Sequence, residues 1–463
     1  MKLLFIHGWS VRDTNTYGEL PEVLIEKLSP KIRLDVHHVY LGRYVSFQDQ
    51  ITMDDLARAF DIARKDVIKN DVFSCITHST GGPVIREWIN RYYGENKLID
   101  LPLKHLIMLA PANHGSALAQ LGKSKVSRIK AWYEGVQPGQ KILDWLELGS
   151  IEQRKLNLDW LKYRFTQRTF FPIVITGEAI DKSLFDYLNT YTAEKGSDGV
   201  VRACATNLNY NHIKLIQDIK QQPTKTLLDG QLIEAHPLLI KGKSITHSPR
   251  CAFEIIPNTS HSGENMGIMK SVNAKTGKNI VVNPIIDALQ VKTTAEYQDL
   301  TQAMDNRTNR LQKGNKSVRG VMLVFSIFDD RNNAVTDFDM YLLATNKYSP
   351  EKLPKGFFID RQKNKLNRNQ LTYYLNNDKL TKIKDGKIGI LLVARPDEGV
   401  SYYSPAVFQS HELSVTDIIK PNQTLLIDIV LTRHVDKQIF RFDELESGRR
   451  DFTSLPTPQN DVP

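Results

Sequence analysis

Residues 73–93 combine an apolar strand pattern, a turn with two glycines and a helical pattern in one short stretch. The stretch begins FSCITHSTGGPVI, and Ser79 stands at the bend between the strand and the helix. A helix that directly follows a strand returns the chain so that a next, parallel strand can pair with the first. The stretch therefore predicts a parallel α/β sheet around Ser79.

Further apolar runs with the length of buried strands lie on both sides of this stretch. They cover residues 2–6, 34–40, 103–109, 170–176 and 251–256, and residues 53–69 have helical spacing. Strands that alternate with helices indicate a mostly parallel sheet with helices on both faces. Residues 117–161 interrupt the alternation with a helical segment that holds three of the five tryptophans, Trp132, Trp145 and Trp160. We expect a cap or lid there.

The pattern changes after Leu311, where a polar linker leads into strand-like runs separated by polar turns. These runs cover residues 320–328, 338–344, 387–394 and 425–432. Short strands with regular turn signals are typical of antiparallel sheets and sandwiches. We therefore expect an α/β domain over residues 1–311, with its cap at about 117–161, and a β-rich, antiparallel, sandwich-like domain over residues 316–463.

Composition places the chain among soluble globular proteins, with 463 residues of which 41% are apolar and 24% charged. Three widely spaced cysteines encode neither a disulfide framework nor a zinc ribbon, so we expect reduced thiols. The N-terminal apolar run is too short for a signal peptide, and no run of 18 apolar residues predicts a transmembrane helix, which favours the cytoplasm. The net charge of +9 favours an anionic partner, but its basic residues match no nucleic-acid-binding module.

Ser79 has the local sequence of a catalytic nucleophile. In the nucleophile turn of the α/β-hydrolase fold, the residues two before and two after the serine crowd each other, so both must be small. Gly81 satisfies the second position, whereas Thr77 stands where the common motif has glycine. We predict an α/β-hydrolase fold with Ser79 as its nucleophile; a serine in an ordinary glycine-rich turn is the competing interpretation.

Two backbone amides should stabilise the oxyanion of such a reaction. Thr80 directly follows the serine and supplies the first amide. The turn after the first strand supplies the second, and the expected donor there is the amide of Gly8 or Trp9. The chemistry requires no metal or cofactor, and the sequence contains neither a ligand cluster nor a phosphate-binding loop.

Order along the chain selects the acid and the base that would act with Ser79, because α/β-hydrolases place the acid and then the histidine after the serine. His261 follows the strand at 251–256 and a turn, where the base should lie, and His247 before that strand is the alternative. Asp198, in the turn GSDGVV, is the expected acid, and Asp181 after the strand at 170–176 is its competitor.

The remaining histidines of this half fit the base less well. His105 and His114 come too early in the order, and His212 and His236 have polar, lysine-rich surroundings with no strand leading into them. His78 should point away from its neighbour Ser79, so we interpret it as structural. We expect His114 to shape a loop or line the substrate pocket.

Five segments together resemble the PlaB-type phospholipases A of bacteria, known from Legionella and Pseudomonas. They are HGWS, ITHSTGG, LIMLAPANHGSALAQLGKS, GSDGVVR and SHSGENMGI, and they span most of residues 1–275. T-H-S-T-G is that family's form of the nucleophile motif. The resemblance implies Ser79 as nucleophile, Asp198 as acid and His261 as base.

The same resemblance implies a β-rich C-terminal domain, cleavage of glycerophospholipids and lysophospholipids, and homo-oligomers. It also implies peripheral association with membranes, at the outer membrane or cell surface. Two basic segments could face lipid: Lys123 to Lys130, and Lys352 to Arg368 around Phe357 and Phe358. The competing hypotheses are a carboxylesterase or neutral-lipid lipase with the same triad, and a non-catalytic lipid- or protein-binding module.

Overall fold

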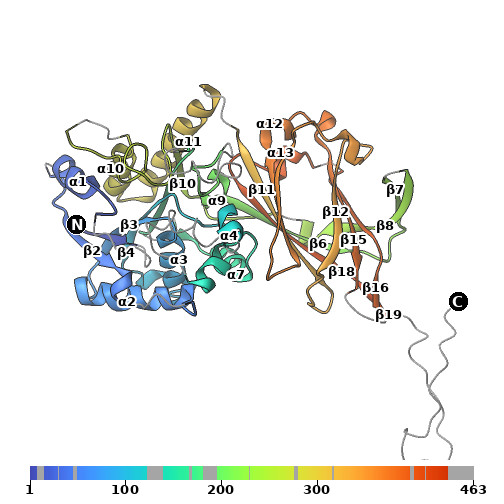
Figure 1. The fold of residues 1–463 in the computed structure, drawn as a ribbon, viewed down its shortest axis with the longest axis horizontal. Coiled ribbons are helices and arrows are strands. Elements are labelled where there is room, and N and C mark those ends of the chain that lie inside the picture. Colours follow the sequence, from blue (N-terminus) through green and yellow to red (C-terminus); the bar gives the residue numbers. More distant parts are fainter. Residues whose placement is uncertain are drawn as a thin grey trace, which may run out of the picture.

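The structure is a computed structural model in which the chain forms an α/β part and a β-rich part side by side (Figure 1). It describes residues 1–7, 15–29, 31–44, 49–122, 139–165, 169–180, 196–228, 230–243, 245–275, 280–314, 318–396, 401–411 and 413–435. Among the helices in these ranges, none has both the length and the apolar character needed to span a bilayer.

The α/β part is built on a six-stranded sheet in the order β10-β5-β4-β3-β1-β2, with every pair parallel. Its strands are β1 (Lys2–His7), β2 (Asp35–Tyr40), β3 (Phe73–His78), β4 (Leu103–Leu109), β5 (Phe171–Gly177) and β10 (Ala252–Ile256). The inner strands are buried along almost their whole length, as expected for parallel strands covered on both faces. The six runs predicted from the sequence are these strands.

Helices cover both faces of this sheet. They are α1 (Leu20–Leu28), α2 (Met53–Ile68), α3 (Gly81–Tyr92), α10 (Val282–Gln290) and α11 (Thr294–Gly314). Side chains alternate across each strand, so Leu4 and Ile6 pack in the core beneath α2 and α3, whereas Leu3 and Phe5 pack in the core beneath α1, α10 and α11. Helix α2 begins with a capping box in which Thr52 and Asp55 satisfy each other's backbone amides.

The segment between β4 and β5 is helical, as predicted, with α4 (Ala117–Gly122), α6 (Gln140–Leu146) and α7 (Ile151–Trp160). Trp145 and Trp160 are buried in the same hydrophobic core as the sheet residues beneath α2 and α3. Trp132 and the basic residues from Lys123 to Lys130 lie outside the described residues. The described helices of the expected cap are therefore continuous with the main core.

The second part is an eleven-stranded sheet with β7 (Thr224–Leu228) and β9 (Thr246–His247) off its main path β12-β15-β17-β8-β6-β18-β11-β14-β13. The strands of this path are β6 (Tyr210–Gln217), β8 (Gln231–Ile240), β11 (Gly320–Asp329), β12 (Asp337–Ala344), β13 (Phe358–Lys363), β14 (Gln370–Asn376), β15 (Ile388–Arg395), β17 (Ala406–Gln409) and β18 (Thr424–Leu431). Strands β16 (Ser401–Tyr403) and β19 (Arg433–Val435) form a separate pair.

The expectation of a purely antiparallel domain is wrong, because β18 pairs in parallel with both β11 and β6. The sheet curls over one core, to which strands from both ends of its path contribute, so it is sandwich-like. The hydroxyl of Tyr373 in β14 donates to the carbonyl of Met340 in β12 at 3.0 Å, which joins the two ends.

Residues 210–247 supply four strands to this sheet, β6 to β9. The expectation that no strand leads into His212 and His236 is therefore wrong, since these residues lie within β6 and β8. Buried and less buried residues alternate along β6, which is the period of a half-buried strand. The second sheet thus takes strands from within residues 1–311, the range that the sequence assigned to the α/β domain.

Short helices complete the described structure: α9 (Ala203–Thr206), α12 (Asn377–Leu380), α13 (Val415–Ile418), η1 (Leu41–Arg43), η2 (Leu98–Asp100), η4 (Lys241–Lys243), η5 (Pro350–Lys352) and η6 (Lys384–Gly386). The three cysteines, Cys75, Cys204 and Cys251, are free and buried.

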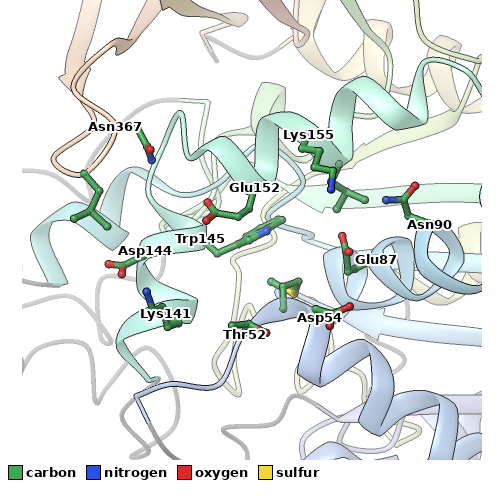
Figure 2. A pocket seen from close by; sticks show the side chains of 13 residues that line it. Thr52, Asp54, Glu87, Asn90, Lys141, Asp144, Trp145, Glu152, Lys155 and Asn367 are labelled. Atoms are coloured by element: carbon green, nitrogen blue, oxygen red, sulfur yellow. The ribbon is translucent and has the colours of Figure 1, made fainter. Parts of the chain in front are cut away.

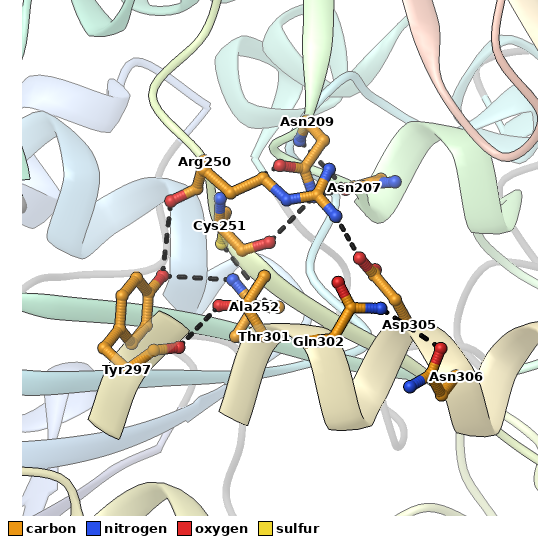
Figure 3. A network of polar contacts seen from close by, with 10 residues as sticks. All are labelled: Asn207, Asn209, Arg250, Cys251, Ala252, Tyr297, Thr301, Gln302, Asp305 and Asn306. Carbon is orange, nitrogen blue, oxygen red and sulfur yellow. Dashed lines mark hydrogen bonds and ion pairs between the residues drawn. The ribbon is translucent and has the colours of Figure 1, made fainter. Parts of the chain in front are cut away.

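A polar network fixes the edge strand β10 to helix α11 (Figure 3). The hydroxyl of Tyr297 accepts a hydrogen bond from the amide of Ala252 at 3.0 Å and donates to the carbonyl of Pro172 in β5 at 2.5 Å. Arg250 forms an ion pair with Asp305 of α11. The network therefore fixes the start of β10, the strand that leads into the loop carrying His261.

Candidate active site

Ser79 lies in a strained turn between β3 and α3. Its φ is +52°, a left-handed backbone conformation that residues other than glycine rarely adopt. The Ser79 amide donates to the carbonyl of Leu109 at 3.0 Å. A Cβ on Gly81 would lie 3.2 Å from the Cβ of Thr77, so these two residues do crowd each other. The turn therefore accommodates threonine at 77 because residue 81 has no side chain.

His261 lies on the loop that follows β10. Its Nε2 is 3.0 Å from Oγ of Ser79, and its side chain is almost fully buried. The loop passes close to the end of β5, where a Cβ on Gly177 would lie 1.9 Å from the carbonyl oxygen of Thr259. Only glycine fits at 177, and this close approach lets the loop bring His261 to Ser79.

Asp198 lies on the other side of the His261 ring. Its Oδ2 is 2.8 Å from Nδ1 of His261, and its Oδ1 accepts hydrogen bonds from the amides of Val200 and Val201 at 2.9 and 2.7 Å. The amide of His261 also donates to the carbonyl of Asp198 at 3.0 Å. The Asp198 and His261 loops are thus joined by both backbone and side chain, and the carboxylate has a fixed orientation.

Of the expected oxyanion donors, Thr80 lies within the described residues and Gly8 and Trp9 lie outside them. Thr80 is the N-cap residue of α3, so its amide is at the positive end of the helix dipole. Strand β1, which ends at His7, pairs directly with β3, and Ile6 lies opposite Thr77. Strand β1 therefore ends next to the Ser79 turn.

The other histidine candidates make different contacts. His247 bonds Asn211 from β9 in the second sheet, and His212 contacts Asp428 there at 2.9 Å. His105 is buried between Ser74 and the carbonyl of Val291, and burial lowers its pKa to about 4. Asp181, the competing acid, lies outside the described residues.

His78, which precedes Ser79 in the chain, and His114, which follows β4, each make their own contacts. His78 Nε2 donates to the backbone carbonyl of His261 at 3.0 Å, and burial holds the pKa of His78 well below its usual value. Nδ1 of His114 is 3.1 Å from the side-chain amide nitrogen of Asn157, and burial lowers the pKa of His114 to about 3. Both rings are neutral at pH 7 and have positions that suit structural roles.

A fully buried arginine supports the loop after β4. Arg86 of α3 donates to Asn113 at 3.1 Å and to Asn157 at 2.8 Å, and its guanidinium lies 4.6 Å from the ring centre of Trp160. Burial lowers the pKa of Arg86 to about 10, so it remains charged. Asn113 in turn donates to the carbonyl of Thr206 at 2.7 Å, which links α3 and α7 to the segment after Asp198.

A separate cavity lies between the start of α2, α3, α6 and α7 (Figure 2). Its lining includes Trp145, two lysines and the carboxylates of Asp54, Glu87, Asp144 and Glu152. Burial and the nearby Asp54 raise the pKa of Glu87. Ser79, Asp198 and His261 do not line this cavity, so it is distinct from their site. Within the described ranges, no three His, Cys, Asp or Glu side chains are arranged to hold a metal.

Two solved structures of the phospholipase PlaB from Legionella pneumophila match almost the whole chain. One is 39% identical with a TM-score of 0.86 and covers 97% of each chain. The other, in complex with thio-NAD, is 38% identical with a TM-score of 0.83 and covers 97% of this chain and 98% of that one.

The chain belongs to the PlaB phospholipase family. No family model and no curated protein sequence matches the chain. The resemblance drawn from five short segments is therefore confirmed by solved structures over both sheets. The family's α/β-hydrolase fold with its β-rich second part is also confirmed.

One buried residue of the PlaB-type segment GSDGVVR had no role assigned from the sequence. Arg202 is four positions after Asp198, and its side chain is only 2% exposed. A charged side chain is almost never fully buried without a partner, yet burial is not readable from a single arginine in a polar turn. Its partner, Asp360, lies far along the chain in β13, which explains why sequence reasoning missed the pair.

Proposed function

We propose that this chain cleaves acyl esters of glycerophospholipids and lysophospholipids through an acyl-enzyme formed on Ser79. Membership of a phospholipase family supports lipid esters as the substrate class. The observation that carries the catalytic proposal is the continuous series of contacts from Ser79 Oγ through the His261 ring to Asp198. A non-catalytic binding module would not require this series.

In the proposed mechanism, Nδ1–H of His261 donates to Asp198, which leaves the Nε2 lone pair to accept the Ser79 proton. Oγ of Ser79 attacks the acyl carbonyl, and the proton taken by His261 passes to the departing glycerol oxygen. A water molecule, deprotonated by the same ring, then releases the fatty acid. The Thr80 amide, together with that of Gly8 or Trp9, stabilises the oxyanion in both steps.

Ser79→Ala should abolish labelling by a fluorophosphonate probe and lower kcat by about 10⁴-fold or more, because it removes the hydroxyl that contacts His261. His261→Ala should lower kcat by a comparable factor, whereas His247→Ala should leave it within about twofold.

Product analysis by mass spectrometry on mixed phospholipids, lysophospholipids and triacylglycerols tests the substrate class. Equal turnover of short-chain esters and phospholipids would favour the carboxylesterase alternative, and full activity of Ser79→Ala would reject the mechanism.

We further propose, on the family resemblance, that the chain forms homo-oligomers and associates peripherally with anionic membranes through the segment from Lys352 to Arg368. Exposed basic residues along this segment support docking, as does Phe358, which is 45% exposed. Phe357 is buried in the core of the second sheet and does not contribute. Lys363 donates to the carbonyl of Thr336 at 2.7 Å and has a structural role.

A further inference from the structure

The loop that carries Asp198 is closed on itself but rests on the second sheet. The amide of Ala203 donates to the carbonyl of Gly196 at 2.9 Å, and Ser197 forms an isolated β-bridge with Arg202. Asp198 lies between these contacts, so any movement of Arg202 or Gly196 moves the carboxylate that contacts His261. What holds this loop in place therefore matters for the site.

The side chain of Arg202 contacts the β-rich part. Its guanidinium forms an ion pair with Asp360 of β13 and lies 4.3 Å from the ring centre of Tyr374 in β14. The side chains of Arg202 and Asp360 are 2% and 14% exposed, so water screens this pair only weakly. Gln362 of β13 donates to the same carboxylate oxygen at 2.9 Å.

Tyr374 also contacts the opposite end of the loop. A Cβ on Gly196 would lie 2.6 Å from the Tyr374 hydroxyl oxygen and 2.8 Å from the carbonyl oxygen of Val318, so only glycine permits this approach. Tyr374 belongs to the hydrophobic core beneath α2 and α3, although it comes from the second sheet. One tyrosine of the β-rich part thus contacts both ends of the loop around Asp198.

Two further hydrogen bonds join the residues after this loop to the second sheet. The hydroxyl of Thr424 donates to the carbonyl of Cys204 at 2.9 Å, and the side chain of Asn207 donates to the carbonyl of Asn422 at 2.7 Å. These bonds fix α9, which follows Arg202 directly. Contacts with the β-rich part are thus made by Gly196, Arg202, Cys204 and Asn207.

We propose that Arg202 is a positioning residue for catalysis: held by Asp360 and Tyr374, it lets the β-rich part set the position of Asp198 against His261. This inference rests on the proposed role of the three residues at Ser79. It assigns a catalytic purpose to the β-rich part, because without β13 and β14 the Asp198 loop loses the groups that fix both its ends. A displacement of about 1 Å in such a site can cost about 100-fold in rate.

The test compares Asp360→Asn with the wild-type full chain on a soluble p-nitrophenyl ester, so that membrane docking plays no part. We expect kcat to fall at least about tenfold and KM to stay within about twofold, because Asp360 is proposed to position Asp198 and not to bind the ester. We also expect the acid limb of the kcat/KM profile to move to lower pH, since a displaced carboxylate no longer stabilises the protonated His261 ring. A purely structural role would not move this limb.

Two more variants complete a double-mutant cycle. Arg202→Gln should lose activity as Asp360→Asn does, and the double variant should recover at least about threefold over either, because no buried charge is left unpaired. Asp337→Asn is the matched control: it breaks an exposed Asp–Arg pair of the same sheet and should leave kcat unchanged. Circular dichroism at the assay temperature establishes that each variant is folded.

If Asp360→Asn does not fold, Arg202→Lys replaces it as the test variant. Lysine keeps the positive charge, but it cannot both pair with the Asp360 carboxylate and lie flat on the Tyr374 ring. It should lose about three- to tenfold in kcat. Unchanged kcat and an unmoved acid limb in a folded variant would overturn the inference. If Ser79→Ala retains activity, the proposed function itself is wrong. This variant therefore distinguishes a failure of the proposed function from a failure of the inference about Arg202.

Discussion

Thr77 and Gly81 are close to each other beneath Ser79, and an added carbon atom at 81 would make a tight contact with Thr77. Thr77 is fully buried, and a Cβ at 81 would lie closer to it than ordinary van der Waals contact allows. The steric condition for a nucleophile turn is thus shared between two positions, and glycine at one of them is enough. This explains why the departure at 77 from the common motif is compatible with a strained φ at Ser79.

Gly81→Ala should destabilise the fold by about 1–3 kcal/mol and slow fluorophosphonate labelling of Ser79, because Thr77 cannot move aside in a filled core. Urea unfolding and labelling rates measure the two effects. Thr77→Gly combined with Gly81→Ala should restore most of the labelling rate, because glycine at 77 leaves room for the added Cβ at 81. If the double variant labels as slowly as Gly81→Ala alone, the crowding does not limit the turn.

At the scale of elements, strands β1, β3, β4, β5 and β10 could be predicted because each is buried along almost its whole length and reads as a largely apolar run, whereas the edge strand β2 is only partly buried. The Ser79 turn could be predicted from local sequence, and Asp198 and His261 from the order of acid and base along the chain in α/β-hydrolases. Strands β6 to β9 could not be predicted so easily, since β6 finds its parallel partner β18 more than 200 residues further along. Pairing at that distance leaves no local signal.

Strand β13 and its flanks carry the proposed membrane contact. Replacing the exposed Lys352, Lys355, Arg361, Lys365 and Arg368 with glutamine should lower binding to phosphatidylglycerol vesicles by about tenfold or more, because each cation near the surface contributes about 1 kcal/mol. Co-sedimentation at low and high salt measures binding. The matched control replaces five exposed lysines of the α/β part: Lys27, Lys31, Lys69, Lys97 and Lys292. Equal loss of binding in both variants would show that net charge, not this strand, drives association.

For the molecule as a whole, buried neutral histidines contribute to the loss of stability in acid. Burial lowers the pKa of His105 to about 4 and that of His114 to about 3, whereas an unfolded histidine titrates near 6.5. Above pH 6.5 neither state takes up these protons. Below it the unfolded state binds protons that the folded state cannot, so stability falls as the pH drops through this window.

Between pH 7.5 and pH 5, His105 alone should account for a loss of about 2 kcal/mol in the free energy of unfolding. His105→Asn should therefore show a correspondingly weaker pH dependence, whatever its stability at pH 7.5. The exposed His411→Asn serves as control and should follow the wild type. Urea titrations at both pH values measure the difference, and parallel curves for wild type and His105→Asn would contradict the assignment.

The place of β18 between β6 and β11 has a consequence during synthesis on the ribosome. The segment that bears Asp198 leads through α9 into β6, and β6 lacks its parallel partner β18 until residues 424–431 have left the exit tunnel. The serine and imidazole are translated long before that moment. A nascent chain would thus carry the Ser79 hydroxyl in an unfinished fold until β18 has emerged, and lipid cleavage by the proposed mechanism would begin only after that.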